Sequence, residues 1–324
     1  MRGIISILLL CLLITSNSFA TIKLSKGIIR YTPVEDKRVV YGKIDCKGSI
    51  YASKFLKIWM REFKSIYPNI KSSFDFQGYE QGINALINGS ANIATTSRKI
   101  RVEELKLFKE QKGYKPIEVK VALDALAIYV NRLNKVEKIT LGELDAIFST
   151  TLNRGYSQNI VSWKSLGGSD EKINIYLLDR TTGTRSYFQD RVMLDGEFKI
   201  DSVTEDGYTT ISEITDRVAD DPNGICFGSV GAKNFGVKAL SLAKQKHFPS
   251  YRPSPQNIKN GKYPLTRFIY LYLDVPPDKQ IPIFLYEFCK FVLSRDGQDG
   301  VLRVGGLPLN PKQIGIELSK IKGE

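Results

Sequence analysis

Histidine is nearly missing from this chain of 324 residues, and no two of its cysteines have the Cys-x-x-Cys spacing. Zinc sites and serine or cysteine triads depend on histidine or cysteine side chains, so the single histidine, His247, leaves little material for either. A Walker motif is missing too, and Gly48-Ser49 has no partner base. The sequence therefore predicts no catalytic residue, no metal and no cofactor. It disfavours an enzyme that acts on phosphate esters or acyl groups.

Long apolar runs are also missing, since none approaches the roughly 20 residues that a membrane-spanning helix needs. The run from Ile4 to Ile14 follows a positive start, Met1-Arg2, and precedes Ser18-Phe19-Ala20. The last three residues offer small side chains at the two positions that a signal peptidase reads. We expect residues 1–20 to be a cleaved signal peptide, and the mature protein to be exported and soluble in the periplasm.

Dense blocks of lysine and arginine are absent, although the formal net charge at pH 7 is +13. A basic surface attracts anions, but charge spread along the whole chain does not indicate which anion. No nucleic-acid-binding motif is present, and export argues further against such a partner. We therefore expect an anionic partner and no nucleic acid.

Cysteine is scarce as well, and the residues that follow the expected signal peptide are Cys46, Cys226 and Cys289. An odd number in an exported protein leaves at least one free thiol. Each of the three stands among apolar residues, which is typical of small buried hydrophobic side chains. Whether any two of them form a disulfide stays open at this point.

What the chain does contain is a repeated order of strand, polar turn and helix. Runs rich in β-branched residues end in glycine or hydroxyl residues, and a helical pattern follows each. This order is typical of a parallel α/β sheet, in which ligands bind beyond the carboxyl ends of the strands. The four turns that we expect to meet in one crevice follow Asp45, Phe76, Thr95 and Leu178.

Other patterns complete the expected secondary structure. Phe55, Trp59 and Phe63 at helical spacing predict a core-facing helix at 52–67, which Pro68 ends. The apolar stretch Ile117 to Asn131 exceeds a usual strand and can run from one domain to another. We expect further helices at 83–88, 102–111, 140–148, 210–219 and 282–294, strands at 39–45, 71–76, 92–98, 173–178, 225–228 and 268–274, and an irregular connection at 247–264.

The turn from Arg180 to Arg185 is the leading candidate for a ligand site. It follows the strand at 173–178, and Thr182 or Thr184 can cap a helix there while Gly183 lets a ligand approach the backbone. The first amides of a helix have no partners inside it and carry the positive end of its dipole, so a small anion can bind them. An ordinary capped helix without a ligand is the alternative.

Five short sequence segments are informative together because of their order and spacing. They are Ala122 to Asn131, Ile147-Phe148 with Trp163 and Gly167-Gly168, Thr182 to Arg185 with Tyr187-Phe188, Tyr263 to Arg267, and Phe291 to Ser294 with Gly297-Gln298. Together they resemble the periplasmic phosphate-binding proteins of bacterial ABC importers, the PstS-like family of type II solute-binding proteins. The resemblance covers about residues 40–312.

The resemblance implies an α/β fold of the two-lobed periplasmic-binding-protein type, with mixed sheets flanked by helices and a cleft between the lobes. Residues 21–39 would form an arm ahead of the first lobe. That lobe would take residues 40–122 and 260–324, and the second lobe residues 123–259. Two strands would form the hinge between them.

The resemblance also implies a set of ligand-binding residues, because this family holds its anion with helix N-terminal amides, hydroxyls and usually an arginine and an acidic group. The set is Ser49, Ile50, Tyr51, Tyr79, Ser97, Arg98, Arg180, Thr182, Gly183 and Thr184. Ile50 stands where a threonine is usual, and Tyr79 stands where a serine is usual. At Ile50 only backbone amides can serve the anion, whereas the Tyr79 phenol can still donate a hydrogen bond, or its bulk can reshape the pocket.

Two more departures concern charge. Ser97 occupies the place of an acidic acceptor found in some members, which weakens the discrimination between hydrogen phosphate and sulfate. Leu178 occupies the place of a frequent arginine, which leaves Arg180 or Arg98 to neutralise the anion.

Taken together, the resemblance implies a monomeric binding protein without enzymatic activity. It would capture inorganic phosphate or a related oxyanion between its lobes and deliver it to a membrane ABC permease. The departures at Ile50, Tyr79 and Leu178 motivate an alternative, an exported surface or interaction protein of the same fold that has lost or changed its ligand specificity.

Overall fold

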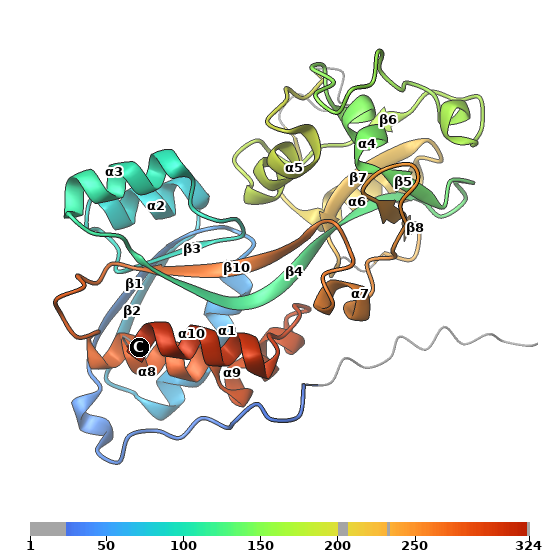
Figure 1. Cartoon of the computed structure of the whole chain (residues 1–324). Coiled ribbons are helices and arrows are strands. Elements are labelled where there is room, and N and C mark those ends of the chain that lie inside the picture. The colour runs from blue at the N-terminus through green and yellow to red at the C-terminus, as the bar shows by residue number, and fades with distance from the viewer. Residues whose placement is uncertain (1–23, 200–206, 232–233, 323–324) are drawn as a thin grey trace, which may run out of the picture.

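The computed structural model of the protein describes residues 24–199, 207–231 and 234–322. The expected signal peptide, residues 1–20, lies outside this part of the chain. Figure 1 shows two lobes of strands and covering helices, with long strands that run from one lobe into the other. No helix in the described ranges is long and apolar enough to cross a membrane.

Among the described residues, eight strands form one sheet that runs through both lobes in the order β2-β1-β3-β10-β4-β7-β6, with β8 also paired to β4; β5 and β9 form a separate pair. In chain order the elements are η1 (Lys37–Val39), β1 (Gly42–Gly48), α1 (Ser53–Ile66), β2 (Ile70–Asp75), α2 (Tyr79–Ile87), β3 (Ile93–Thr96), α3 (Val102–Lys112), β4 (Ile117–Asn131), β5 (Lys138–Thr140), α4 (Leu141–Phe148), η2 (Trp163–Leu166), β6 (Asn174–Ile175), α5 (Gly183–Met193), α6 (Ile211–Asp220), β7 (Gly224–Ser229), β8 (Val237–Ala239), β9 (Ser241–Ala243), α7 (Pro255–Lys259), β10 (Thr266–Leu273), α8 (Ile283–Leu293), α9 (Arg295–Arg303) and α10 (Pro311–Lys322).

The sheet is mixed. β1 is parallel to both β2 and β3, and β6 is parallel to β7. In contrast, β10 is antiparallel to β3 and β4, and β4 is antiparallel to β7. The expectation of a parallel sheet from the strand-turn-helix order is therefore wrong for β4 and β10, which run between the lobes. It holds for β1, β2 and β3, so the turns after these three strands share one edge.

In the first lobe, α2 and α3 cover one face of the sheet, and α1, α8, α9 and α10 cover the other (Figure 1). Phe55, Trp59 and Phe63 of α1 are fully buried, as their helical spacing predicted. The indole nitrogen of Trp59 donates to the Gly297 carbonyl oxygen at 2.8 Å, which satisfies a polar group that burial would otherwise leave without a partner.

The second lobe is built around β6, β7 and β8, with α4, α5 and α6 packed on them. Its core is aromatic: the rings of Phe188 and Phe227 stack with centroids 3.9 Å apart, and Phe148 meets both edge-on. The helix α4 begins with the expected capping box, in which the Thr140 hydroxyl accepts from the Glu143 amide at 3.1 Å. These contacts fix the second lobe as a packed unit.

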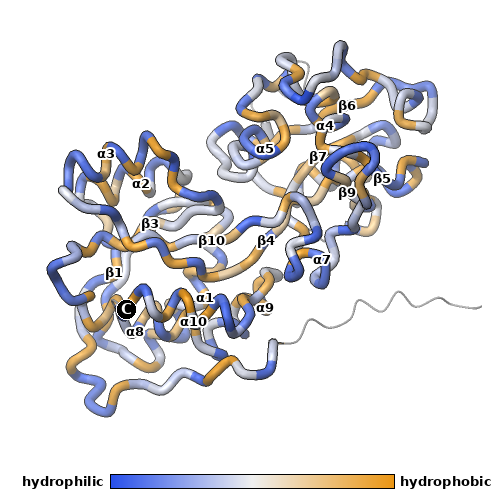
Figure 2. The backbone as a smooth tube through the Cα atoms, in the orientation of Figure 1, coloured by the Kyte–Doolittle hydropathy of each residue, from blue (hydrophilic) through white to orange (hydrophobic). Residues whose placement is uncertain are grey.

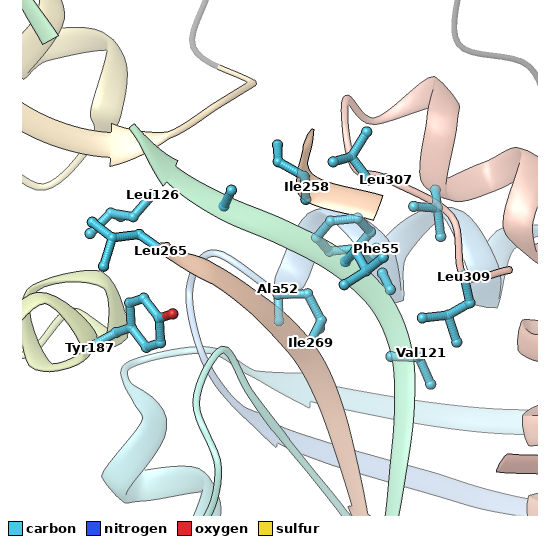
Figure 3. Packing of buried hydrophobic residues seen from close by; sticks show 14 of the residues in the cluster. Ala52, Phe55, Val121, Leu126, Tyr187, Ile258, Leu265, Ile269, Leu307 and Leu309 are labelled. Atoms are coloured by element: carbon cyan, nitrogen blue, oxygen red, sulfur yellow. The ribbon is translucent and has the colours of Figure 1, made fainter. Parts of the chain in front are cut away.

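The long strand β4 joins the lobes. It pairs with β10 from Ile117 to Ala125 and with β7 from Leu126 to Val130. At this change of partner, the Leu126 amide donates to the Leu265 carbonyl oxygen at 2.9 Å. Figure 3 shows the two leucines on the crossing segments, with the Tyr187 hydroxyl of α5 directed toward the start of β10. Figure 2 shows hydrophobic residues along this part of β4. The bounds expected for the two lobes stay a prediction.

The arm that leads into β1 lies along the first lobe (Figure 1). The Arg295 amide donates to the Ile29 carbonyl oxygen at 2.7 Å, and the Tyr31 amide donates to Asp296 at 2.8 Å. The Tyr31 hydroxyl donates to the buried Glu287 of α8. The arm is therefore held by specific hydrogen bonds at the start of α9 and on α8.

Several elements differ from the sequence-based expectation. The helix expected at 83–88 begins earlier, at Tyr79, and the connection expected to be irregular contains α7. The helices α9 and α10 were not expected at all. The cysteines that follow the expected signal peptide are free and buried, and burial raises the pKa of each thiol. They are inert core residues, as their apolar surroundings predicted.

Candidate functional site

Three turns of the first lobe meet at the carboxyl ends of β1, β2 and β3. The Ser49 amide donates to the Thr95 carbonyl oxygen at 2.9 Å, and the Gly78 amide donates to the Gly48 carbonyl oxygen at 3.2 Å. Gly48 has a φ of 140°, and a Cβ there would lie 2.1 Å from the Thr95 carbonyl oxygen. Only glycine fits this turn, so the close approach of the turns after β1 and β3 depends on it.

The fourth expected turn comes from the second lobe and begins α5. Thr182 caps this helix, because its hydroxyl accepts from the Arg185 amide at 3.3 Å. Gly183 and Thr184 follow as the first helical residues and are buried. A Cβ added to Gly78 would lie 3.5 Å from the Thr181 carbonyl oxygen, so the turns of the two lobes are neighbours. The structure thus brings together the four turns that the sequence predicted to meet.

A buried ion pair lies beside the start of α5. The Arg267 side chain donates to Asp124 Oδ2 through Nε at 2.9 Å, and Nη2 lies 2.7 Å from the same oxygen. Both side chains are 1% exposed. Arg267 Nη2 also donates to the Thr184 hydroxyl at 3.1 Å. The first turn of α5 is therefore contacted by an arginine on β10, and this arginine is held by an aspartate on β4, the other crossing strand.

The ion pair continues into a chain of hydroxyl groups. Ser229 Oγ of β7 donates to Asp124 Oδ1 at 2.6 Å, so the Tyr51 hydroxyl, 2.6 Å from Ser229 Oγ, acts as donor to it. Burial, and next the negative charge of Asp124, raise the pKa of Tyr51 well above its usual value. The guanidinium of Arg267 lies over the rings of Tyr51 and Tyr187, with centroid distances of 5.2 and 5.5 Å. Tyr51 is thus a neutral donor in this network.

Two buried polar atoms at this place have no hydrogen-bond partner among the described residues. One is the Ser97 hydroxyl, directly after β3, and the other is Nη1 of Arg267. Continuing the pairing of Thr96 with Tyr270 places Ser97 opposite Ile269, two residues from Arg267. A buried donor without a partner costs about 1–3 kcal/mol, more when charged. Such atoms are open to an acceptor from a ligand or from ordered water.

Most members of the set implied by the resemblance lie at these turns. Ser49, Ser97, Gly183 and Thr184 are buried there, and Tyr51 reaches the ion pair through Ser229. Ile50 is 45% exposed, so its side chain is not packed into the site. Tyr79 is the first residue of α2, and its side chain lies outside the described part of the structure.

The two arginines expected to neutralise an anion are placed differently. The Arg98 guanidinium donates to both carboxylate oxygens of Glu104, at 2.9 and 2.6 Å. Arg180 is exposed, and Leu178 is buried in an apolar cluster of the second lobe. The buried arginine that contacts the start of α5 is instead Arg267.

Reasoning from the sequence missed Arg267, Asp124 and Ser229 as site residues. One signal was available: Asp124 interrupts the apolar stretch of β4, and a charged residue in such a strand needs a partner. Arg267 is the second residue of a strand with similar apolar character, so each of the two was a possible partner for the other. The sequence could not show this pairing, because the residues are separated by 143 positions.

The described ranges contain no group of three or more histidine, cysteine, aspartate or glutamate side chains that could hold a metal ion. The donors gathered at the four turns are amides, hydroxyls and a guanidinium. This donor set suits an oxyanion, since all of its members can donate hydrogen bonds to oxygen.

Comparisons with known proteins identify the family of the chain. The family described as PBP superfamily domain matches residues 35–296. A relative from Pseudomonas aeruginosa named phosphate-binding protein PstS is 34% identical over 277 residues, which cover 84% of this chain and 85% of the relative. The solved structure of PstS from Borrelia burgdorferi is 26% identical, with a TM-score of 0.60 over 83% of this chain and 99% of that one.

A further structure shows the fold alone, because its identity is lower. The ABC-type phosphate transport receptor from Vibrio cholerae has a TM-score of 0.67 and 24% identity, over 82% of this chain and all of that one. Family membership rests on two findings. The family model matches most of the chain, and a relative of nearly the same length is 34% identical. The chain belongs to the PBP superfamily, and within it to the PstS-like family of solute-binding proteins.

Proposed function

We propose that this chain is an exported solute-binding protein that captures inorganic phosphate between its two lobes and delivers it to an ABC importer. The relatives from Pseudomonas aeruginosa and Borreliella burgdorferi are both named phosphate-binding proteins, which supports the ligand. The Vibrio cholerae protein of the same fold is an ABC-type phosphate transport receptor, which supports the importer. The protein acts as a monomer in the periplasm and catalyses no reaction.

The observation that carries the proposal is the buried guanidinium of Arg267 at the first turn of α5. Asp124 holds Nε and Nη2 of this side chain, which leaves Nη1 as a charged donor without a partner among the described residues. The helix adds the amides of its first turn and the positive end of its dipole. An anion at this place gains charge compensation and hydrogen bonds at the same time.

The site draws its donors from both lobes. Ser49 and Ser97 belong to the first lobe, Gly183 and Thr184 to the second, and Arg267 lies on a strand that joins them. An anion that contacts both sets stabilises the closed arrangement of the lobes over any open one. The protein therefore captures the anion because the anion makes more contacts in the closed arrangement than in the open one.

Asp124 positions Arg267 and does not contact the anion. Its Oδ1 accepts from Ser229, and its Oδ2 accepts from Arg267. Ser229 and Arg267 thus engage both oxygens, and the carboxylate serves to orient Arg267. The acceptor for the proton of hydrogen phosphate is the Ser97 hydroxyl, which can accept as well as donate.

The experiment is a panel of anions measured by calorimetry and thermal unfolding, with phosphate, arsenate, sulfate and molybdate. A ligand at 100 times its dissociation constant stabilises the protein by about 2.7 kcal/mol. We expect phosphate and arsenate to bind and sulfate to bind more weakly. A panel in which no anion binds or shifts the transition would contradict the proposal and favour an exported interaction protein of the same fold.

A further inference from the structure

A cavity of about 480 Å³ lies between the lobes, next to the anion site. Its walls come from the segment that begins α3, from α5 and from the start of β10. The lining residues are Arg98, Lys99, Ile100, Arg101, Val102, Glu103, Tyr187, Asp190, Arg191, Asp195, Thr266, Arg267, Phe268 and Tyr270. Binding sites for small organic molecules have volumes of about 300–1,000 Å³, so this cavity has room for more than a bare oxyanion.

The lobes are in contact beside the cavity, so the cavity is not merely the space between two separated lobes. Arg101 Nη2 of the first lobe donates to the Ser186 hydroxyl of the second lobe at 3.0 Å. The Tyr187 hydroxyl donates to the Thr266 carbonyl oxygen at 2.9 Å and fixes α5 against β10. Ser49 and Thr184 are not among the residues that line the cavity, so the cavity adjoins the anion site and is separate from it.

Arg267 joins the anion site to the cavity. Its Nη2 contacts Thr184 at the start of α5, while the same guanidinium lines the cavity. The side chain is buried, and Nη1 has no hydrogen-bond partner among the described residues. A ligand held by Arg267 can therefore have one group at the α5 turn and another in the cavity.

The charges around the cavity argue against a second phosphate group. Arg98 is paired with Glu104 at 2.6 Å, and Lys99 lies 3.9 Å from Glu118. The remaining charged residues of the lining, apart from Arg267, balance closely: Arg101 and Arg191 against Glu103, Asp190 and Asp195. A second dianionic group would face these three carboxylates as well as the two arginines, so it would gain no net attraction from them. A polar, uncharged group with hydroxyls would find donors, acceptors and the faces of aromatic rings.

We propose that the protein also binds phosphate monoesters of small polyols, with the phosphate at the α5 turn and the polyol in this cavity. The inference rests on the proposed function, because it uses the same anion site. It extends the ligand from inorganic phosphate to a class of organic phosphates, and it names the cavity as the part of the protein that admits the substituent.

The test is calorimetry with phosphate, glycerol 3-phosphate and diphosphate on the mature chain and two variants. Val102 lines the cavity and is 78% exposed, so Val102→Trp can project a large ring into it without touching the turns at Ser49, Ser97 and Thr184. Leu107→Trp, on the same helix and 51% exposed, adds the same side chain outside the cavity lining and is the matched control.

We expect the unmodified chain to bind glycerol 3-phosphate within about tenfold of its affinity for phosphate, and diphosphate more weakly than either. Val102→Trp should weaken the ester at least tenfold and leave phosphate unchanged, while Leu107→Trp should change neither; tenfold corresponds to about 1.4 kcal/mol. Binding of phosphate without binding of the ester would overturn this inference alone. Equal weakening of both ligands by Val102→Trp would also overturn it, and binding of neither ligand would overturn the proposed function as well.

Discussion

Arg267 and Asp124 form the one arginine-carboxylate pair in the described ranges whose two side chains are both 1% exposed. Such a pair contributes little net stability, since the cost of removing both charges from water offsets their attraction. The role of the pair is to orient the arginine, since Asp124 holds the guanidinium in a single position against Thr184. Removing one partner leaves the other as an uncompensated buried charge, which is the costly change.

Arg267→Gln should therefore affect stability and binding together. The unpaired Asp124 should lower the free energy of unfolding by about 3–5 kcal/mol, and phosphate binding should fall at least tenfold. The double variant Asp124→Asn with Arg267→Gln should recover most of the stability but none of the binding. Urea unfolding and calorimetry measure the two effects separately. Phosphate affinity retained in the single variant would show that Arg267 is not the charge that holds the anion.

The first turn of α5 allows a test without a change of charge. Thr184→Ala removes a hydroxyl that is buried and contacts Arg267, and it should raise the dissociation constant for phosphate by about two- to tenfold. Gly183→Asp should abolish binding, because it places a carboxylate at the helix N-terminus where the anion binds. Thr209→Ala, an exposed threonine of the same lobe, is the control and should bind as the unmodified chain does. Unchanged affinity in Thr184→Ala would remove this turn from the site.

At the scale of the elements, the turn after β1 depends on one glycine. Gly48→Ala should destabilise the protein by more than the roughly 1–3 kcal/mol of backbone strain, because the new Cβ would lie 2.1 Å from the Thr95 carbonyl oxygen. Gly155 also has a positive φ, 87°, but nothing lies within 4 Å of a Cβ there. Gly155→Ala therefore reports strain alone. Urea unfolding that gives equal losses for the two variants would show that the close approach at Gly48 is not required.

The start of α3 carries a pH-dependent contribution to stability. Burial opposes ionisation of Glu104, but hydrogen bonds from Arg98 and the Arg101 amide outweigh it and hold its pKa below the usual 4.5. A carboxyl with a lowered pKa in the folded state stabilises the protein at neutral pH, and this contribution is lost as pH falls below 4.5. Glu104→Gln should thus be less stable than the unmodified chain at pH 7, with the difference shrinking on acidification.

The control for that measurement is Glu110→Gln on the same helix. Glu110 is exposed, and its contact with Lys106, at 3.9 Å, lies on the surface, so the substitution should have little effect at any pH. Chemical unfolding at several pH values gives the comparison. A difference between Glu104→Gln and the unmodified chain that stayed constant with pH would contradict the role given to ionised Glu104.

Elements with a strong local pattern could be predicted from the sequence. The bounds of β4 match the apolar stretch from Ile117 to Asn131, and α1 matches the spacing of its buried aromatic residues. The helix α9 was missed because Gly297 and Gly300 fall inside it, and glycine disfavours a helix unless packing compensates. A Cβ at Gly297 would lie 2.3 Å from the Phe291 carbonyl oxygen, so tertiary packing requires the glycine there.

In the site, too, features set by neighbouring residues could be predicted, and features set by residues distant in the sequence could not. The turns at Ser49, Ser97 and Thr184 could be predicted, because each follows its own strand. The charge could not, because Arg267 and Asp124 meet through the antiparallel pairing of β10 with β4, far apart in the sequence. No short-range pattern specifies that pairing, and Arg98 and Arg180 were expected only because they lie near the turns.

At the scale of the whole molecule, ligand capture depends on contacts that join the lobes. Arg101, just before α3 in the first lobe, and Ser186 of α5 make such a contact at 3.0 Å, and neither belongs to the anion-binding turns. A contact that exists only when the lobes are together adds to the free energy of the closed arrangement. Its loss lowers the closed fraction, and the apparent affinity for every ligand falls by the same factor.

Ser186→Ala should therefore raise the dissociation constant for phosphate by about two- to tenfold, the equivalent of one hydrogen bond, while the bound anion keeps all its contacts. Small-angle scattering should show a larger radius of gyration for the ligand-free variant than for the ligand-free unmodified chain. Ser212→Ala, an exposed serine on α6, should change neither quantity. Ser186→Ala should raise the dissociation constants for phosphate and for a phosphate monoester by the same factor, unlike Val102→Trp, because both ligands require the same closure of the lobes. If Ser186→Ala weakened the binding of one ligand alone, the residue would act on that ligand directly and not on the approach of the lobes.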